Sequence, residues 1–207
     1  MGRSILAERY DSLVPDYDPA TALIVVDVQN DFADPAGSLF VRGGPDVVPV
    51  LDDAISVARA AGAFVVYTQD WHPESTPHFA KDGGIWPVHC VAGSWGAELH
   101  GDLIIDGPVV RKGSNGEDGY SGFTMRHPLS GETRPTELEV LLREHAVERV
   151  VVGGLATDYC VKATALDAMR LGFPTELLLD AIRAVDLTPG DGERALDEMR
   201  RAGVRLV

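Results

Sequence analysis

The fold is decided by the stretch Val147-Glu148-Arg149-Val150-Val151-Val152-Gly153-Gly154-Leu155-Ala156-Thr157-Asp158-Tyr159-Cys160. Its apolar part, 147–152, is typical of a buried strand, and the segment 158–171 has the pattern of a helix. Cys160, one of only two cysteines, is therefore expected in the first turn of a helix, just past a strand end. Free N–H groups and the helix dipole there are expected to lower the pKa of the thiol and can hold an oxyanion. The alternative is a buried structural cysteine.

Strands and helices alternate along the rest of the chain. The patterns predict strands at 22–28, 63–68, 108–112, 147–152, 175–180 and 204–207, and helices at 45–61, 136–145, 158–171 and 191–202. This alternation predicts an α/β fold: a doubly wound, mainly parallel six-stranded sheet with helices on both faces. Residues 1–19 are polar and contain two prolines near their end, which indicates an N-terminal surface arm. Residues 20–207 contain no linker and are expected to form one domain.

Composition excludes several classes of partner. The formal net charge is −14 and the pI is about 4.7, so nucleic acid and anionic membrane surfaces are not expected to bind. No apolar run approaches the length of a membrane span, and the N-terminus lacks the apolar core of a signal peptide. Two cysteines provide no disulfide framework, so we expect a cytoplasmic protein.

Polar residues stand at the ends of four predicted strands. Asp27 ends the first strand, Asp70 follows the second, Lys112 ends the third, and Cys160 follows the fourth. Ligands of open α/β sheets bind beyond the carboxyl ends of the strands. A single strand-end acid is as often a turn former or helix cap, and a single lysine is more often a solvated charge. Four such residues at one edge indicate a site.

The long loop after the second predicted strand carries a histidine cluster. Asp70, His72, His78 and His89 fall within twenty residues, and this set suits a borderline divalent metal such as zinc, iron or manganese. The alternative is three surface histidines. Cys90 is a further candidate ligand, although a buried packing residue is the better interpretation.

Three aromatic residues lie in loops that leave the same edge of the sheet: Phe32, Trp86 and Tyr120. Together they are expected to wall a flat, ring-shaped substrate, although each alone is more typical of local packing. The glycine-rich loop 113–122 has no G-x-x-x-x-G-K-[ST] pattern and is therefore not a phosphate-binding loop.

Several motifs, taken in order, resemble the nicotinamidases and pyrazinamidases of the isochorismatase-like cysteine hydrolases. The resemblance covers about residues 20–207, which would form an isochorismatase-like hydrolase domain. It is carried by Asp27-Val28-Gln29-Asn30-Asp31-Phe32, the Asp70/His72/His78/His89 set, Trp86-Pro87-Val88-His89-Cys90, Tyr120-Ser121-Gly122-Phe123 and Gly154-Leu155-Ala156-Thr157-Asp158-Tyr159-Cys160. Two features depart from many relatives: Tyr159, where histidine is frequent, and a slightly long 113–119 loop.

The resemblance implies hydrolysis of nicotinamide to nicotinate and ammonia through a cysteine thioester, and also hydrolysis of pyrazinamide, within NAD salvage. It implies that Cys160 is the nucleophile, Asp27 the proton shuttle and Lys112 the stabilising cation. Backbone N–H groups of Ala156 and Cys160 would form the oxyanion hole, next to a cis peptide at Leu155–Ala156. One divalent metal ion per chain would bind the ring nitrogen, and the fold often self-associates.

Other functions fit parts of the same pattern. An amidohydrolase acting on a different small amide would use the same residues. In a metal-dependent hydrolase, metal-bound water would attack and Cys160 would only pack. A metal-binding interaction module without catalysis would leave the combination of Asp27, Lys112 and Cys160 unexplained.

Overall fold

The computed structural model describes residues 15–207. Its six-stranded sheet has the order β3-β2-β1-β6-β7-β8, and every pair of neighbouring strands is parallel. The strands are β1 (Thr21–Val26), β2 (Phe64–Asp70), β3 (Val109–Lys112), β6 (Arg149–Leu155), β7 (Thr175–Arg183) and β8 (Arg205–Leu206). The predicted six-stranded α/β sheet is therefore confirmed.

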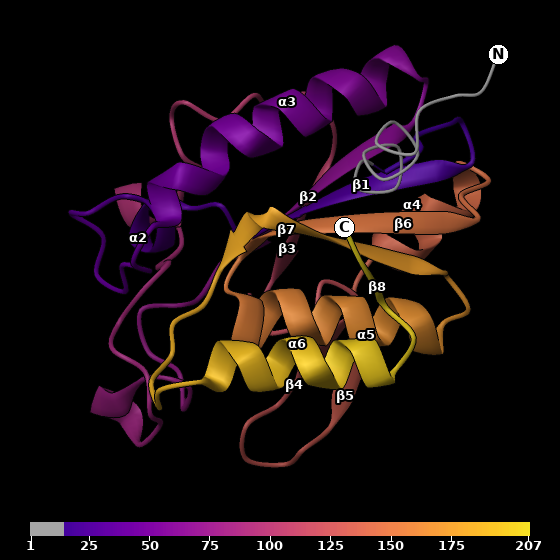
Figure 1. The fold of residues 1–207 in the computed structure, drawn as a ribbon. Coiled ribbons are helices and arrows are strands. Elements are labelled where there is room, and N and C mark those ends of the chain that lie inside the picture. Colours follow the sequence, from indigo (N-terminus) through magenta and orange to yellow (C-terminus); the bar gives the residue numbers. More distant parts are fainter. Residues whose placement is uncertain (1–14) are drawn as a thin grey trace, which may run out of the picture.

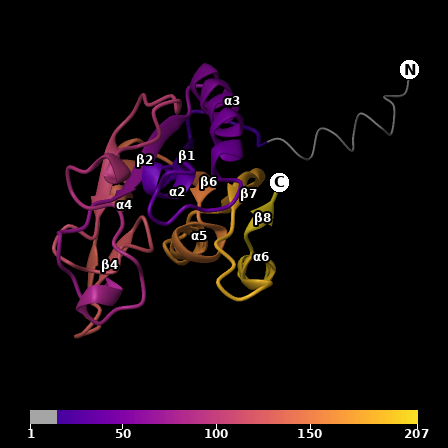
Figure 2. The ribbon, with the colours of Figure 1, turned by 90° about the vertical axis from the view of Figure 1, so that its left-hand side faces the viewer.

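Helices cover both faces of the sheet, as Figures 1 and 2 show. Helix α3 (Val47–Ala60) packs on one face, where Leu51 and Ile55 meet Leu23 and Val25 of β1 in one core. Helices α4 (Leu138–Glu144), α5 (Lys162–Arg170) and α6 (Asp191–Arg201) contribute to the second core. β1 is buried along its whole length and supplies both cores alternately, as expected for a central parallel strand.

Three features differ from the sequence-based prediction. A two-stranded antiparallel sheet, β4 (Thr124–Arg126) with β5 (Thr133–Pro135), and the short helix α2 (Asn30–Ala33) were not predicted. Of the expected surface arm, the described part, 15–19, includes buried Pro15 and Tyr17, and Tyr17 belongs to the α3 core. Residues 1–14 of that arm lie outside the described residues.

The predicted helix 158–171 begins differently as well. A π-helical turn, Thr157–Val161, precedes α5, so Cys160 lies in a π turn and not in the first turn of an α-helix. Such π turns occur frequently at functional sites. No helix within residues 15–207 combines the length and apolar character needed to cross a bilayer.

Gly154 allows β6 to approach β1 closely at the point where both strands lead into the polar edge. Its φ is +124°, and a Cβ at this position would collide with the backbone of Val26, including the carbonyl oxygen. Only glycine tolerates both constraints. The Gly153-Gly154 pair in the deciding stretch is thus explained in part by strand packing.

We expect Gly154→Ala to lower the free energy of unfolding by more than about 3 kcal/mol, because it combines backbone strain with a clash in the sheet. Gly172→Ala is the control: its φ is +86° but no atom lies within 4 Å of the added Cβ, so it should cost only about 1–2 kcal/mol. Urea denaturation measures both. Equal losses for the two variants would contradict the close-approach explanation.

Candidate active site

Side chains from three strand ends meet at a buried ammonium group. Lys112, the last residue of β3, places its Nζ 2.6 Å from Asp27 Oδ2 and 2.6 Å from Asp70 Oδ1. The same Nζ lies 3.7 Å from Cys160 Sγ and also donates to the carbonyl of Gly119. The four side chains of Asp27, Asp70, Lys112 and Cys160 are all buried, and the prediction that they meet at one edge is confirmed.

The backbone at the strand ends fixes the two carboxylates. Asp27 has a φ of +49°, so the chain leaves the strand direction directly after β1, and its Oδ1 accepts a 2.6 Å hydrogen bond from Thr68 Oγ1. Gln29 binds the backbone of Asp70 twice: its Nε2 donates to the carbonyl oxygen, and its Oε1 accepts from the N–H, both at 2.8 Å. In the β2–β3 ladder Asp70 is the register partner of Lys112, which sets the two side chains next to each other.

The pKa values of the three charged groups are shifted in different directions and for different reasons. Burial raises the pKa of Asp27 to about 6 against the opposing effect of Lys112, so this carboxyl is mostly ionised at pH 7. Burial alone would also raise the pKa of Asp70, but Lys112 and the nearby imidazoles hold it below its usual value. Burial alone would lower the pKa of Lys112, but the two carboxylates raise it well above its usual value. The site therefore contains one ammonium between two carboxylates.

The predicted lowering of the Cys160 pKa is wrong for this geometry. Burial raises the pKa of the Cys160 thiol well above its ordinary value, and the nearby carboxylates of Asp27 and Asp70 act in the same direction. Only Lys112 opposes them. The reason is that the thiol lies fully buried and faces two acids as well as one cation. The resting residue is thus a thiol whose proton needs an acceptor, and an Asp27 carboxylate oxygen lies within 4.8 Å of the sulfur.

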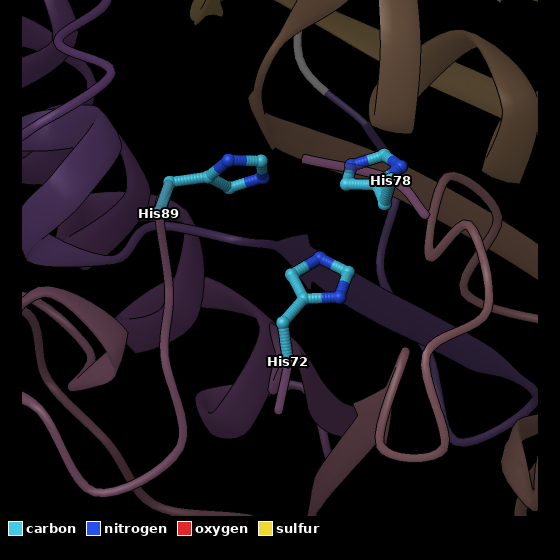
Figure 3. Close-up of side chains that lie close together, drawn as sticks. All are labelled: His72, His78 and His89. Carbon is cyan, nitrogen blue, oxygen red and sulfur yellow. The ribbon is translucent and has the colours of Figure 1, made fainter. Parts of the chain in front are cut away.

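The three histidines converge at a second point. His72, His78 and His89 are buried, each offers a ring nitrogen within 4.8 Å of the others, and their rings face one another in Figure 3. His78 Nδ1 lies 2.7 Å from Asp118 Oδ1, and His89 Nδ1 lies 2.7 Å from the carbonyl oxygen of Pro87. Both rings therefore keep Nε2 free for another partner.

This cluster fits a divalent metal on observations of the structure itself. Neither ring nitrogen of His72 has a hydrogen-bond partner among residues 15–207, although both are buried. Burial lowers the pKa of His89 to about 4, so this ring is neutral, as a metal ligand must be. Buried imidazole nitrogens without partners are costly unless something binds them.

Asp70 stands between the two clusters. Its Oδ1 accepts from Lys112, while its Oδ2 lies 3.7 Å from His72 Nε2. The Asp70 carboxylate lies within 4.8 Å of ligand atoms of Asp27 and Cys160, whereas the three histidines form a separate set. Asp70 thus connects the two parts of the site.

A small cavity joins the two clusters. It has about 410 Å³ of atom-free space, including the part that opens to solvent. Its lining includes Cys160 and Ala156, Asp70, and two of the three clustered histidines, His78 and His89. The three aromatic residues singled out in the sequence, Phe32, Trp86 and Tyr120, are also among its lining residues.

Sequence reasoning missed one aromatic wall residue and one polar neighbour. Tyr159 lines the cavity and meets Trp86 edge-on, with ring centroids 4.8 Å apart, while Trp86 Nε1 donates to Tyr120 Oη at 2.9 Å. In the sequence Tyr159 stood out only as a departure at a position where relatives often carry histidine, and it was not predicted to line the cavity. Asp118, the partner of His78, stands among the glycines of the 113–122 loop, where nothing local distinguished it from a turn residue.

Two further expectations are met. The Leu155–Ala156 peptide is cis, as the family resemblance implied. Cys90 is fully buried in the α3 core and belongs to neither cluster, so the interpretation as a packing residue is confirmed.

Comparisons with known proteins agree with this geometry. The chain is 38% identical to the nicotinamidase of Escherichia coli (strain K12), covering 91% of this chain and 94% of that protein. It is 40% identical to the nicotinamidase/pyrazinamidase of Mycobacterium tuberculosis, and the match covers 90% of this chain and 97% of that protein. The pyrazinamidase of Pyrococcus horikoshii, solved in complex with zinc, superposes with a TM-score of 0.80 at 42% identity. The match covers 91% of this chain and 99% of that one.

A protein from L. infantum, solved in complex with nicotinate, superposes with a TM-score of 0.84 at 39% identity, covering 94% of this chain and 96% of that one. A family model described as the isochorismatase domain matches residues 21–207. With that match and with these relatives along nearly the whole chain, the protein belongs to the isochorismatase family, as its motifs predicted.

Proposed function

We propose that the protein hydrolyses nicotinamide to nicotinate and ammonia through a thioester on Cys160, and that it also accepts pyrazinamide. The observation that carries the proposal is the buried Lys112, which gathers Asp27, Asp70 and Cys160 beside a cavity that also borders the histidine cluster. The nicotinamidases and pyrazinamidases among its relatives support this choice of substrates.

The first half of the reaction forms the thioester. The Cys160 sulfur attacks the carboxamide carbon while its proton passes to Asp27, which is mostly ionised at pH 7 because its pKa is about 6. Backbone N–H groups of Ala156 and Cys160 would stabilise the oxyanion. Asp27 then gives the proton to the amide nitrogen, the C–N bond breaks, and ammonia leaves.

The second half regenerates the enzyme. Water attacks the thioester carbon and gives a proton to Asp27, the C–S bond breaks, and the sulfur recovers a proton as nicotinate forms. Lys112 is charged in the resting site, because the two carboxylates raise its pKa well above its usual value. Its role is to hold Asp27 in place and to stabilise negative charge on the sulfur at 3.7 Å.

One divalent ion would be held by His72, His78 and His89, with Asp70 beside them. From these nitrogen and oxygen donors we infer zinc, iron or manganese. When bound, the ion supplies a Lewis-acid contact for a lone pair on the substrate. Phe32, Trp86, Tyr120 and Tyr159 would border the faces of the ring. A pyridine with its carboxamide at the 3-position would offer its carboxamide carbon to Cys160 and the lone pair of its ring nitrogen to the ion at the histidine cluster.

The cellular setting is part of the proposal. Both cysteines are free thiols, which suits the reducing cytoplasm in which we expect the enzyme to work in NAD salvage. Self-association remains a prediction.

Ammonia release from nicotinamide tests the function directly. Wild-type protein loaded with metal should release ammonia, and Cys160→Ala should lose at least about a hundredfold in rate, or ~2.7 kcal/mol of barrier. Cys90→Ala is the matched control, since Cys90 lies outside both clusters, and once shown to be folded it should retain turnover. Wild-type protein that is inactive on nicotinamide would refute the proposed substrate, and an active Cys160→Ala would refute the nucleophile.

The pH dependence of Cys160 alkylation tests whether the Lys112 ammonium favours the thiolate. Thiolate is the form that iodoacetamide attacks, and Lys112 is the cation that lowers the thiol pKa. Lys112→Met should therefore move the midpoint of the alkylation–pH curve to higher pH. Lys162→Met removes the same charge two residues from Cys160, but Lys162 pairs with Glu198 at the surface, so its curve should match wild type. Circular dichroism checks the fold, and a folded Lys112→Met with an unshifted curve would contradict the assigned role.

Benzamide tests the orientation of the substrate. It has the shape and the carboxamide of nicotinamide but lacks the ring nitrogen, so it should lose its anchor at the histidine end of the cavity. We expect kcat/KM for benzamide to be at least about a hundredfold lower, since a site built for a polar partner rejects an analogue that lacks it. Comparable kcat/KM values for the two amides would contradict this orientation.

A further inference from the structure

The 113–122 loop places three consecutive residues against three different parts of the site. The Asp118 carboxylate meets His78, the Gly119 carbonyl accepts from Lys112, and the Tyr120 hydroxyl accepts from Trp86. The loop must lie close to the site for this, because a Cβ on Gly119 would come within 2.6 Å of Asp70 Oδ1. The reaction proposed above involves Lys112, Trp86 and Tyr120 but gives no role to Asp118.

The contact of Asp118 determines which nitrogen of His78 is free. A carboxylate can only accept a hydrogen bond, so the 2.7 Å approach of Asp118 Oδ1 requires the proton on Nδ1 of the ring. The lone pair then lies on Nε2. At His89 the carbonyl of Pro87 imposes the same arrangement, whereas neither nitrogen of His72 has a hydrogen-bond partner among the described residues.

We propose that Asp118 is a positioning residue of the metal centre: it fixes the tautomer and the ring orientation of His78 and thereby strengthens binding of a divalent cation. A carboxylate that accepts from the far nitrogen of a ligand histidine also raises the basicity of the ligating nitrogen. The inference rests on the metal site of the proposed function, and it extends that site to the loop that also carries Gly119 and Tyr120.

The backbone of Asp118 is held without its carboxylate. Its N–H donates to the carbonyl of Arg126 at 2.6 Å, and its own carbonyl accepts from the N–H of Arg126 at 3.3 Å. Among residues 15–207, His78 is the only hydrogen-bond or ion-pair partner recorded for the Asp118 carboxylate. Removal of this side chain should therefore leave the loop in place and change only the histidine.

Zinc affinity tests the proposal without any substrate. Metal-free full-length protein is titrated with Zn²⁺ in competition with a chromogenic chelator. Asp118→Ala should bind Zn²⁺ about 10- to 100-fold more weakly. Asp118→Asn should lose less, because its amide oxygen still accepts from Nδ1–H. Asp82→Asn is the matched control, because Asp82 lies in the His78 loop but binds the Thr76 N–H and Lys81. The zinc affinity of this variant should stay within about threefold of wild type, as expected when no metal ligand is touched.

The double variant separates a positioning role from a general loss of structure. If Asp118 acts through His78, Asp118→Ala should weaken zinc binding no further in a His78→Ala background. Additive losses would overturn the proposal. It would also be overturned by unchanged affinity in Asp118→Ala, by an equal loss in Asp82→Asn, or by wild-type protein that binds no zinc. If wild type and variants rank in zinc affinity as predicted but the wild-type protein releases no ammonia from nicotinamide, only the proposed function is contradicted.

Discussion

The site depends on one buried ion cluster, the Lys112 ammonium between the carboxylates of Asp27 and Asp70. Such a group is costly to bury, and loss of one partner from a buried pair typically costs about 3–5 kcal/mol. The structure offsets this cost with close geometry: two 2.6 Å ion pairs, a third acceptor at Gly119, and a hydrogen bond from Thr68 to the Asp27 carboxylate. Gln29 adds two hydrogen bonds to the backbone of Asp70, which hold that residue in place. The sheet order brings the three residues together, because β1, β2 and β3 are neighbours and all end at the same edge.

The same cluster explains how one site can serve two chemical tasks. Asp27 has a raised pKa, which suits the proposed proton exchange with Cys160, whereas Asp70 has a lowered pKa and remains a carboxylate beside His72. The difference arises from their surroundings and not from their chemistry, since both accept from the same ammonium. One acid is thus suited to proton transfer and the other to holding positive charge.

The features of the fold and the site that were predictable from sequence follow from regular patterns. The apolar runs that end at Asp27, Asp70 and Lys112 indicate buried parallel strands, and parallel strands deliver their ends to one edge. The protonation of Cys160 was not predictable, because burial and the two acids come from distant segments and outweigh the local helix position. The β4–β5 hairpin was missed because its strands have only three residues each. The contact of Asp118 with His78 joins two irregular loops forty residues apart, and no periodic pattern encodes it.

A crystal structure of the zinc-loaded protein with nicotinaldehyde would show whether Cys160 attacks the carbonyl carbon of a ring held at the histidine cluster. The thiol should add across the aldehyde C=O, so that the carbon bonds to Cys160 Sγ and the proton ends on the new hydroxyl oxygen. We expect continuous density from Cys160 to the ring. The oxygen should lie near the backbone N–H groups of Ala156 and Cys160, and the ring nitrogen should point toward the three clustered histidines. An adduct on Cys90, a ring turned the other way, or an aldehyde bound outside the Cys160 cavity would contradict it.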